Sequence, residues 1–267
     1  MAKVIAVAVP KGGVGKTTTA VNLAASLAAF EKRTLLVDTD ILGACSLSLG
    51  FSREKVQGGL FQVFNFSHSI SQVIHRTEIA FLDFVPTNVY TTQHEDRFYR
   101  LAENRTILKN SLRGVLPHYD YIILDCPPML RGLTTNALTS ADSVLIPVKA
   151  GHFSLDAVDR LMKYLEWIHE VANARLELEG VLLTMHEPNT KVSDITEREL
   201  RLRFRKHVLK TIIPKNTHLV EASFYGKPGL LFNATSKGTL AYLQLAREIL
   251  DRAEPVAAAQ DQQHTGT

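Results

Sequence analysis

The sequence predicts an α/β fold: a doubly wound, mostly parallel sheet with helices on both faces. Short segments rich in β-branched residues alternate along the chain with longer segments of helical periodicity. Several of the short segments are apolar throughout, as strands buried on both faces should be. A repeated strand–helix–strand order produces a parallel sheet, and such sheets bind ligands at the carboxyl ends of their strands.

The predicted elements follow one another in a single domain over residues 1–253. The strands are predicted at 4–9, 34–37, 80–85, 121–124, 143–148, 180–184 and 211–213. The helices between and after them are predicted at 16–29, 95–112, 155–172, 192–208 and 237–253. Residues 254–267 are small, polar and aperiodic, so we expect a disordered C-terminal tail there.

The composition is that of a globular protein that does not cross a membrane. Hydrophobic residues make up 45% of the 267 residues and charged residues 21%. No apolar run approaches the roughly 18 residues of a membrane span, and the N-terminus reads as a strand and not as a signal peptide. The two cysteines, Cys45 and Cys126, lack metal-ligand spacing and are expected to be free thiols.

A glycine-rich loop between the first strand and the first helix predicts a phosphate-binding site. Its glycines let backbone N–H groups turn inward, and the following helix N-terminus favours phosphate oxygens. Lys16 can reach the β- and γ-phosphates of a nucleotide, and the Thr17 hydroxyl can ligate Mg²⁺. Pro10 replaces the usual first glycine, so the loop is a variant. The predicted nucleotide-binding residues here are Lys11, Gly12, Gly13, Val14, Gly15, Lys16, Thr17 and Thr18.

Carboxylates end two of the predicted strands. Asp38 and Asp40 follow the strand at 34–37, and Asp125 follows the strand at 121–124 in a Walker B pattern. We expect Asp125 to hold Mg²⁺, through water. Ordinary surface acids at a strand end are the alternative for Asp38 and Asp40.

These motifs resemble those of one family. K-G-G-V-G-K-T-T at 11–18 and Y-I-I-L-D-C-P-P at 121–128 are similar to the deviant Walker A and Walker B motifs of the ParA/MinD ATPases, and the resemblance extends from residue 3 to about 250. It implies ATP and Mg²⁺ as ligands and an ATP-bound homodimer. In that dimer Lys11, the second lysine of the loop, would contact the nucleotide of the other subunit and act with Lys16 in catalysis.

The resemblance also assigns roles outside the loop. It implies that Asp40 positions the attacking water and that Asp38 lies near Mg²⁺, although Ile41 and Leu42 replace the family's Pro-Gln pair. The stretch 211–229 is similar to a family segment that contacts adenine, which here implies Pro214 and Asn216. A purely structural strand–loop–helix is the alternative for that stretch.

Positive charge is concentrated in one segment. Residues 191–210 carry seven Lys or Arg and three acids, a net +4, while the rest of the chain sums to −1. On a helix, Arg198, Arg201 and Arg205 fall within an arc of roughly 60°, a pattern that suits a nucleic-acid phosphate backbone. A solvated helix face is the alternative, but the resemblance to the ParA branch implies non-specific DNA binding here.

Together these features predict a weak, partner-stimulated ATPase of the ParA type. We expect it in the cytoplasm on the nucleoid, with a ParB-like or cargo-adaptor protein stimulating hydrolysis. Because no helix-turn-helix pattern precedes the first strand, operator-specific binding is not expected. Membrane binding of the MinD kind is the alternative, although the segment beyond Ala253 has neither Lys nor Arg and so lacks the basic amphipathic helix that such binding uses. A metabolic P-loop enzyme is the third possibility.

Overall fold

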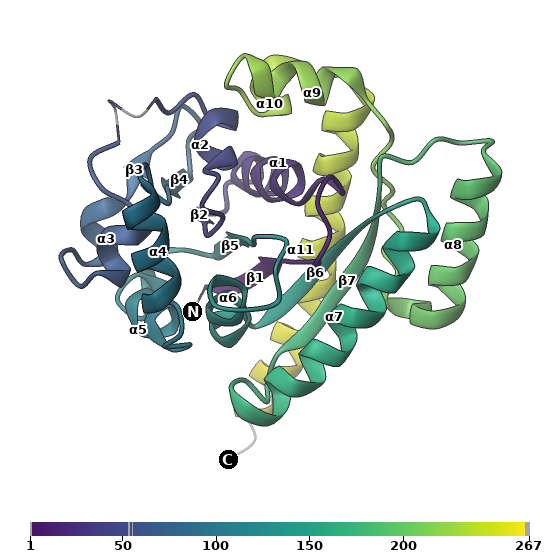
Figure 1. Cartoon of the computed structure of the whole chain (residues 1–267). Helices are drawn as coiled ribbons and strands as arrows, with labels where there is room; N and C mark the ends of the chain where they lie inside the picture. The colour runs from purple at the N-terminus through teal and green to yellow at the C-terminus, as the bar shows by residue number, and fades with distance from the viewer. Residues whose placement is uncertain (1, 53, 55, 265–267) are drawn as a thin grey trace.

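The computed structural model describes residues 2–52, 54 and 56–264 and has one seven-stranded sheet (Figure 1). The strand order is β3-β4-β2-β5-β1-β6-β7, with only the edge strand β3 antiparallel. This confirms the predicted doubly wound sheet. The strands are β1 Lys3–Val7, β2 Thr34–Asp38, β3 His75–Arg76, β4 Leu82–Val85, β5 Tyr121–Asp125, β6 Ser143–Lys149 and β7 Glu177–Thr184.

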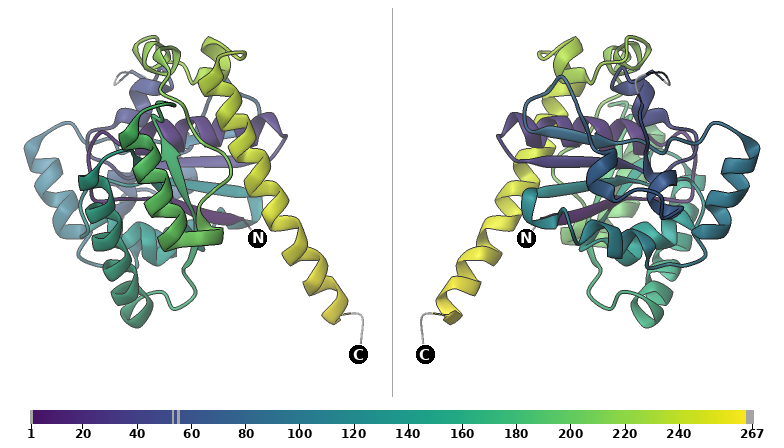
Figure 2. Two further views of the ribbon diagram at one scale, coloured as in Figure 1. Left: turned by 90° about the vertical axis from the view of Figure 1, so that its right-hand side faces the viewer. Right: turned by 90° about the vertical axis from the view of Figure 1, so that its left-hand side faces the viewer.

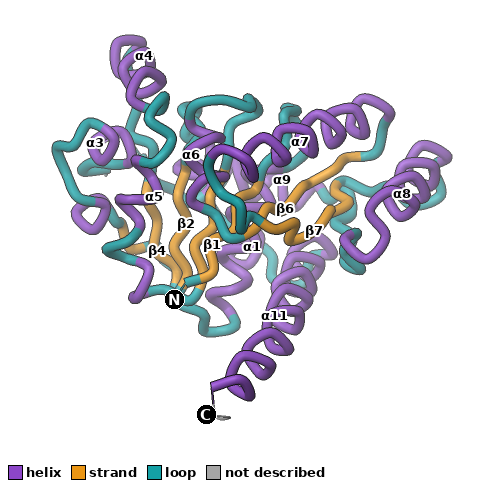
Figure 3. The backbone as a smooth tube through the Cα atoms, turned by 90° about the horizontal axis from the view of Figure 1, so that it is seen from below, coloured by secondary structure: helices purple, strands orange, loops and turns teal. Residues whose placement is uncertain are grey.

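Helices cover both faces of the sheet, with α6 and α7 on one side and α11 on the other (Figure 3). The sheet therefore has two cores. Ile5 and Val7 of β1 pack with α1 and α11, whereas Val4 and Ala6 pack with the α5–α7 side. The longer helices are α1 Lys16–Ala29, α4 Thr92–Leu101, α5 Ile107–Leu112, α6 Leu133–Ser140, α7 His152–Val171, α8 Lys191–Phe204, α9 Thr217–Phe224 and α11 Lys237–His264.

The strand register brings the motifs to one edge of the sheet. Asp38 at the end of β2 lies opposite Asp125 at the end of β5, and Asp125 lies opposite Val7 at the end of β1. Short helices fill the connections near this edge: α2 Ala44–Ser48, α3 Leu60–Phe64 and α10 Gly229–Phe232. The parallel pairing thus places the phosphate loop and the carboxylates side by side.

The predicted helix at 95–112 is two helices in the structure. The chain leaves the helix after Leu101 and resumes at Ile107, and the Asn104 carboxamide oxygen accepts the N–H of Thr106 at 3.2 Å in between. Such a local turn competes with the helix for backbone groups. Helical periodicity on both sides of the break conceals it in the sequence.

The predicted strand at 211–213 is wrong. This segment runs along β7 without forming a strand: the isolated bridges beside it, Val208 with Val181 and His186 with Pro214, lie on either side of 211–213. Ile213 donates its N–H to Leu183 at 2.9 Å, and Pro214 has no N–H with which to continue a ladder.

Helix α11 continues beyond the predicted end at Ala253 as far as His264, and its last turns project from the body of the molecule (Figure 2). The expected disordered tail is thus helical in its first eleven positions, where Ala and Gln favour helix. Residues 265–267 lie outside the described part of the chain, and the division into one ATPase domain and a tail stays a prediction.

Candidate functional site

The phosphate loop connects β1 to α1 and has the backbone that its glycines predict. Gly13 and Gly15 have φ values of 69° and 87°, in the left-handed region that side chains disfavour. Val14 between them is buried, and its carbonyl accepts the hydroxyl of Thr184 at 2.8 Å. The end of β7 therefore holds the loop in place.

The two lysines of the loop have different surroundings. Lys16 is buried, and its ammonium donates to the carbonyl of Lys11 at 2.8 Å. Burial lowers the pKa of Lys16, and the charge of Asp125 opposes this effect. Lys11 is half-buried, and its ammonium donates to the hydroxyl of Ser154 near the start of α7 at 3.1 Å.

Asp125 and Thr17 lie in contact beneath the loop. The Thr17 hydroxyl donates to Oδ2 of Asp125 at 2.7 Å. The other oxygen, Oδ1, is buried and has no hydrogen-bond partner among the described residues. A buried, unpartnered carboxylate oxygen beside a hydroxyl is a donor set that Mg²⁺ prefers, so the residues present fit the predicted metal.

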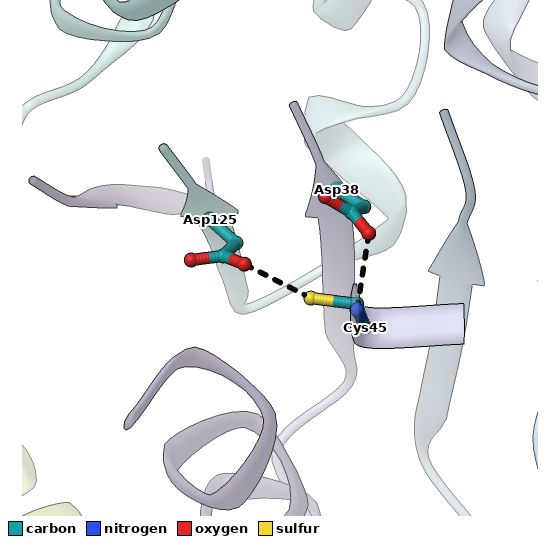
Figure 4. Close-up of side chains that lie close together, drawn as sticks. All are labelled: Asp38, Cys45 and Asp125. Carbon is teal, nitrogen blue, oxygen red and sulfur yellow. Dashed lines mark hydrogen bonds between the residues drawn. The ribbon is translucent and has the colours of Figure 1, made fainter. Parts of the chain in front are cut away.

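Asp38 and Cys45 complete a buried cluster with Asp125 (Figure 4). Asp38 accepts the N–H groups of Asp40 at 3.0 Å and Cys45 at 3.1 Å, and the Cys45 thiol donates to Asp125 at 3.3 Å. One ligand atom of each of the three side chains lies within 4.8 Å of the others. Both cysteines are free, as predicted, but no pattern in the sequence indicated that Cys45 would join the carboxylates.

The electrostatics of this cluster favour a cation. Burial raises the pKa of Asp125 to about 6, although the hydrogen bond from Thr17 works in the opposite direction. Burial and the charge of Asp125 also raise the pKa of Asp38 well above its ordinary value. Two buried carboxylates at adjacent strand ends destabilise each other, and a divalent cation between them and a phosphate would remove that cost.

Asp40 lies at the same edge of the sheet and donates its N–H to Asp38, but its carboxylate is not one of the three clustered side chains. Its side chain is buried, and Oδ1 accepts the N–H of Leu42 at 3.1 Å. The carbonyl of Asp40 accepts the N–H of Gly43, which has a φ of 64° and leads into α2. The departure at Ile41-Leu42 is thus accommodated in a tight turn that leaves Leu42 exposed.

A cavity of about 380 Å³ lies beside the phosphate loop. Gly15 and Thr18 line it on the loop side, and Pro214 and Asn216 line it on the other. The side chain of Asn216 also caps α9, since its Oδ1 accepts the N–H of Leu219 at 3.2 Å. The structure therefore brings the predicted adenine residues to the phosphate loop.

Sequence reasoning missed several residues of this site. Thr184 and Met185 line the cavity at the end of β7, and Ser154 contacts Lys11. The position of Thr184 at the carboxyl end of a predicted strand was the one available signal. Ser154 lies near a helix start with no motif of its own.

The three arginines predicted on one helix face do not share one. Helix α8 ends at Phe204, and Arg205 has a φ of 46°, so it leaves the helical path. Arg201 pairs with Glu197 at 2.8 Å one turn earlier. The expected common arc is therefore wrong for Arg205, although all three side chains are exposed. Leu200 and Val208 are buried.

The sequence is similar to a known domain family and to characterised partition proteins. A family model described as an AAA domain matches residues 2–178. The chromosome partitioning protein ParA of Myxococcus xanthus is 39% identical over 253 residues, which cover 95% of this chain and 89% of the relative. The sporulation initiation inhibitor protein Soj of Bacillus subtilis is 39% identical over 249 residues, covering 93% and 98%.

Solved structures share the fold over the same length. A cobyrinic acid a,c-diamide synthase from Mycobacterium smegmatis with bound ADP and magnesium has a TM-score of 0.81 and 28% identity, covering 95% of this chain and 96% of the other. Its match and those of the two partition proteins extend over nearly the whole chain, and the family match at 2–178 includes the phosphate loop and the carboxylate strands. The chain therefore belongs to the ParA/Soj family of P-loop ATPases.

Proposed function

We propose that this chain binds ATP with Mg²⁺, closes into a homodimer, and in that form binds DNA without sequence preference to segregate or position cargo. One observation carries the proposal. The two lysines of the loop, the Thr17–Asp125 contact and the carboxylates Asp38 and Asp40 all lie at one edge of the sheet. This arrangement supplies cations for phosphate, donors for Mg²⁺ and a carboxylate for water.

Lys16 binds the phosphates of ATP. In the proposed complex the Lys16 ammonium leaves the Lys11 carbonyl for the β- and γ-phosphate oxygens, and the N–H groups of Gly13–Thr17 point at the same oxygens. Thr17 and Asp125 would hold Mg²⁺, with Asp38 beside Asp125. The bound cation would supply positive charge against the phosphate oxygens. Asp40 holds the attacking water in line with the γ-phosphate.

Lys11 acts across the dimer. Lys11 is half-buried at the start of the phosphate loop, and its ammonium donates to Ser154 of the same subunit. A second subunit placed on this face brings its own phosphates toward Lys11, which then supplies charge in the manner of an arginine finger. ATP thus joins the two copies, and hydrolysis releases them.

The exposed arginines of α8 and its end provide the DNA contacts. Arg198 and Arg205 point to solvent, as does Arg201 beside Glu197. A partner protein, ParB-like or a cargo adaptor, stimulates a slow hydrolysis in the cytoplasm, and the ATPase associates with the nucleoid. The partition relatives support this choice.

Two other functions make different predictions. A MinD-like regulator would bind anionic membranes. Among the described residues, no helix is both long and apolar enough to cross a bilayer. The resemblance to a structure named as a diamide synthase favours, as a second candidate, an ATP-dependent ligase on the same scaffold. Such an enzyme would require a small acceptor for turnover.

The variant Asp40→Ala tests the proposal. It should bind ATP as the unchanged protein does, lose hydrolysis by at least about 100-fold, and remain dimeric with ATP. Sedimentation with DNA and with anionic liposomes then separates the alternatives. Asp96→Ala, at an exposed position on α4, is the matched control.

The results of these measurements distinguish the three functions. Sedimentation with liposomes and not with DNA would establish the membrane regulator. Turnover that begins only when a small acceptor is added would establish the ligase. Full hydrolysis by Asp40→Ala would remove Asp40 from the mechanism.

A further inference from the structure

The carboxylate cluster at the strand ends contains a sulfur donor, the Cys45 thiol. Cys45 lies in α2 and is fully buried, and its Sγ donates to Oδ2 of Asp125 at 3.3 Å (Figure 4). Its backbone N–H donates to Asp38 at 3.1 Å, which holds the residue against the strand ends. The proposed ATPase cycle assigns this sulfur no role, because Mg²⁺ takes oxygen donors.

The three side chains converge from separate elements at distances that suit a metal ion. Asp38 ends β2, Asp125 ends β5 and Cys45 belongs to α2, and one ligand atom of each lies within 4.8 Å of the others. Zinc bonds of about 2.3 Å to sulfur and about 2.0 Å to oxygen, at tetrahedral angles, hold those two atoms about 3.5 Å apart. The Sγ–Oδ2 distance of 3.3 Å is close to that separation, so these two atoms need to move little.

A buried oxygen of Asp125 also points to a cation. Oδ1 has no hydrogen-bond partner among the described residues, although Asp125 is 0% exposed. Buried charged oxygens are normally hydrogen-bonded or bound to a metal ion. The positive charge of Lys16 acts on Asp125, but the Lys16 ammonium donates to the carbonyl of Lys11. The negative charge of the cluster therefore lacks a direct ion pair among the described residues.

The donor set favours a thiophilic cation over Mg²⁺. A thiolate suits Zn²⁺ or Co²⁺, whereas Mg²⁺ keeps oxygen ligands and several of its own waters. Three protein ligands leave a fourth position for water, as in zinc sites that are not closed. Thr17 is half-buried and donates to Asp125 at 2.7 Å, so the cluster adjoins the partly exposed phosphate loop, from which a cation can enter.

We propose that Asp38, Cys45 and Asp125 form a binding site for a thiophilic divalent cation such as Zn²⁺, with the Cys45 thiolate as one ligand. The thiol releases its proton to solvent as the bond from Sγ to the metal forms, and the carboxylates supply oxygen ligands. The site shares Asp125 with the proposed Mg²⁺ site, so one cation excludes the other. In this respect the inference rests on the proposed function.

Cobalt(II) tests the site directly, because a thiolate bound to Co²⁺ gives an intense charge-transfer band in the near ultraviolet. Co²⁺ added to the reduced, nucleotide-free, full-length protein should produce this band, with saturation at about one cobalt ion per chain, and Zn²⁺ should remove it. Cys45→Ala should lose the band and bind Zn²⁺ at least about tenfold more weakly. Cys126→Ala is the matched control, since Cys126 is equally buried but does not belong to the cluster.

A second variant tests the carboxylate ligands. Asp38→Asn keeps both thiols and should weaken Co²⁺ binding at least about tenfold, with circular dichroism showing that each variant is folded. The proposal would be overturned by the absence of the band in the unchanged protein, or by a band that survives Cys45→Ala and is lost in Cys126→Ala. Binding of ATP with Mg²⁺ is measured separately: its absence would defeat the proposed function, whereas a missing cobalt band with ATP binding intact defeats this inference alone.

Discussion

At the scale of single residues, the two lysines of the phosphate loop differ in their burial and in their hydrogen-bond partners. Lys16 is buried and donates to the loop's own backbone, and in the proposed function it binds the phosphates of its own subunit. Lys11 is half-buried and reaches Ser154 on a different element. In the proposed function the buried lysine therefore acts within its own subunit, and the half-buried lysine acts on the other subunit of the dimer.

Changing Lys11→Ala should separate ATP binding from dimerisation. We expect ATP affinity to change little, while the ATP-dependent dimer weakens at least about tenfold, because each copy loses one charge-assisted contact with its partner's phosphates. Light scattering across a range of protein concentrations measures the dimer. Lys32→Ala, at another half-buried lysine, is the control. An unchanged dimer affinity would refute the role of Lys11 across the interface.

At the scale of elements, one buried amide fixes the helices behind the site. Asn136 of α6 accepts the N–H of Leu108 at 3.2 Å and donates to the carbonyls of Ala102 at 2.8 Å and Gly132 at 3.3 Å. These bonds satisfy backbone groups that the break between α4 and α5 would otherwise leave unpaired. The role of Asn136 is therefore structural.

Asn136→Ala should lower the free energy of unfolding by about 2–3 kcal/mol, because it leaves buried backbone groups without partners. Urea unfolding followed by circular dichroism measures this. Asn110→Ala, at an exposed position of α5, should change stability by less than about 0.5 kcal/mol. Equal stability of the two variants would mean that water replaces the Asn136 bonds.

Helix α8 makes a second prediction at this scale, because its arginines differ in their ion pairs. Arg203 pairs with Asp159 at 2.9 Å, whereas no ion pair of Arg198 or Arg205 is found within the described residues. Changing Arg198 and Arg205 to Ala together should weaken DNA binding and reduce its salt slope by about 2. Arg203→Ala should leave the slope nearly unchanged. An unaltered slope in the double variant would move the DNA surface elsewhere.

At the scale of the whole molecule, the buried carboxylates oppose folding until a cation arrives. The pKa of Asp125 is about 6 in the folded chain, above the ordinary 3.8. The folded state therefore binds this proton more tightly than the unfolded state does. Stability from this group is greatest below about pH 4 and is lost as the pH rises to about 6.

Asp125→Asn should therefore stabilise the nucleotide-free protein at pH 7, by about 1–3 kcal/mol, and should abolish Mg²⁺-dependent hydrolysis. Urea unfolding at pH 5 and pH 7 checks both the size and the direction of the effect. Asp120→Asn is a control of opposite sign, because hydrogen bonding to Arg33 lowers the pKa of Asp120. A variant less stable than the unchanged protein at pH 7 would show that the Thr17 and Cys45 bonds outweigh the burial of charge.

Local sequence patterns were enough to predict the parallel α/β fold and the positions of the phosphate loop and Asp125. These features depend on local patterns: apolar strands, glycines at fixed spacing, and acids at strand ends. Helix α1 begins and ends where its pattern predicts, at Lys16 and Ala29. Such motifs are contiguous in the chain, so their local geometry depends little on the rest of the fold.

Contacts between residues far apart in the chain could not be predicted in this way, because they depend on how the strands and helices pack. Cys45 contacts Asp125, Thr184 holds the loop at Val14, and Arg105 faces Trp167, each across a long separation in the chain. The end of α8 before Arg205 and the lost strand at 211–213 likewise depend on packing against β7. Strand order and register set these distances, and no local pattern in one sequence encodes them.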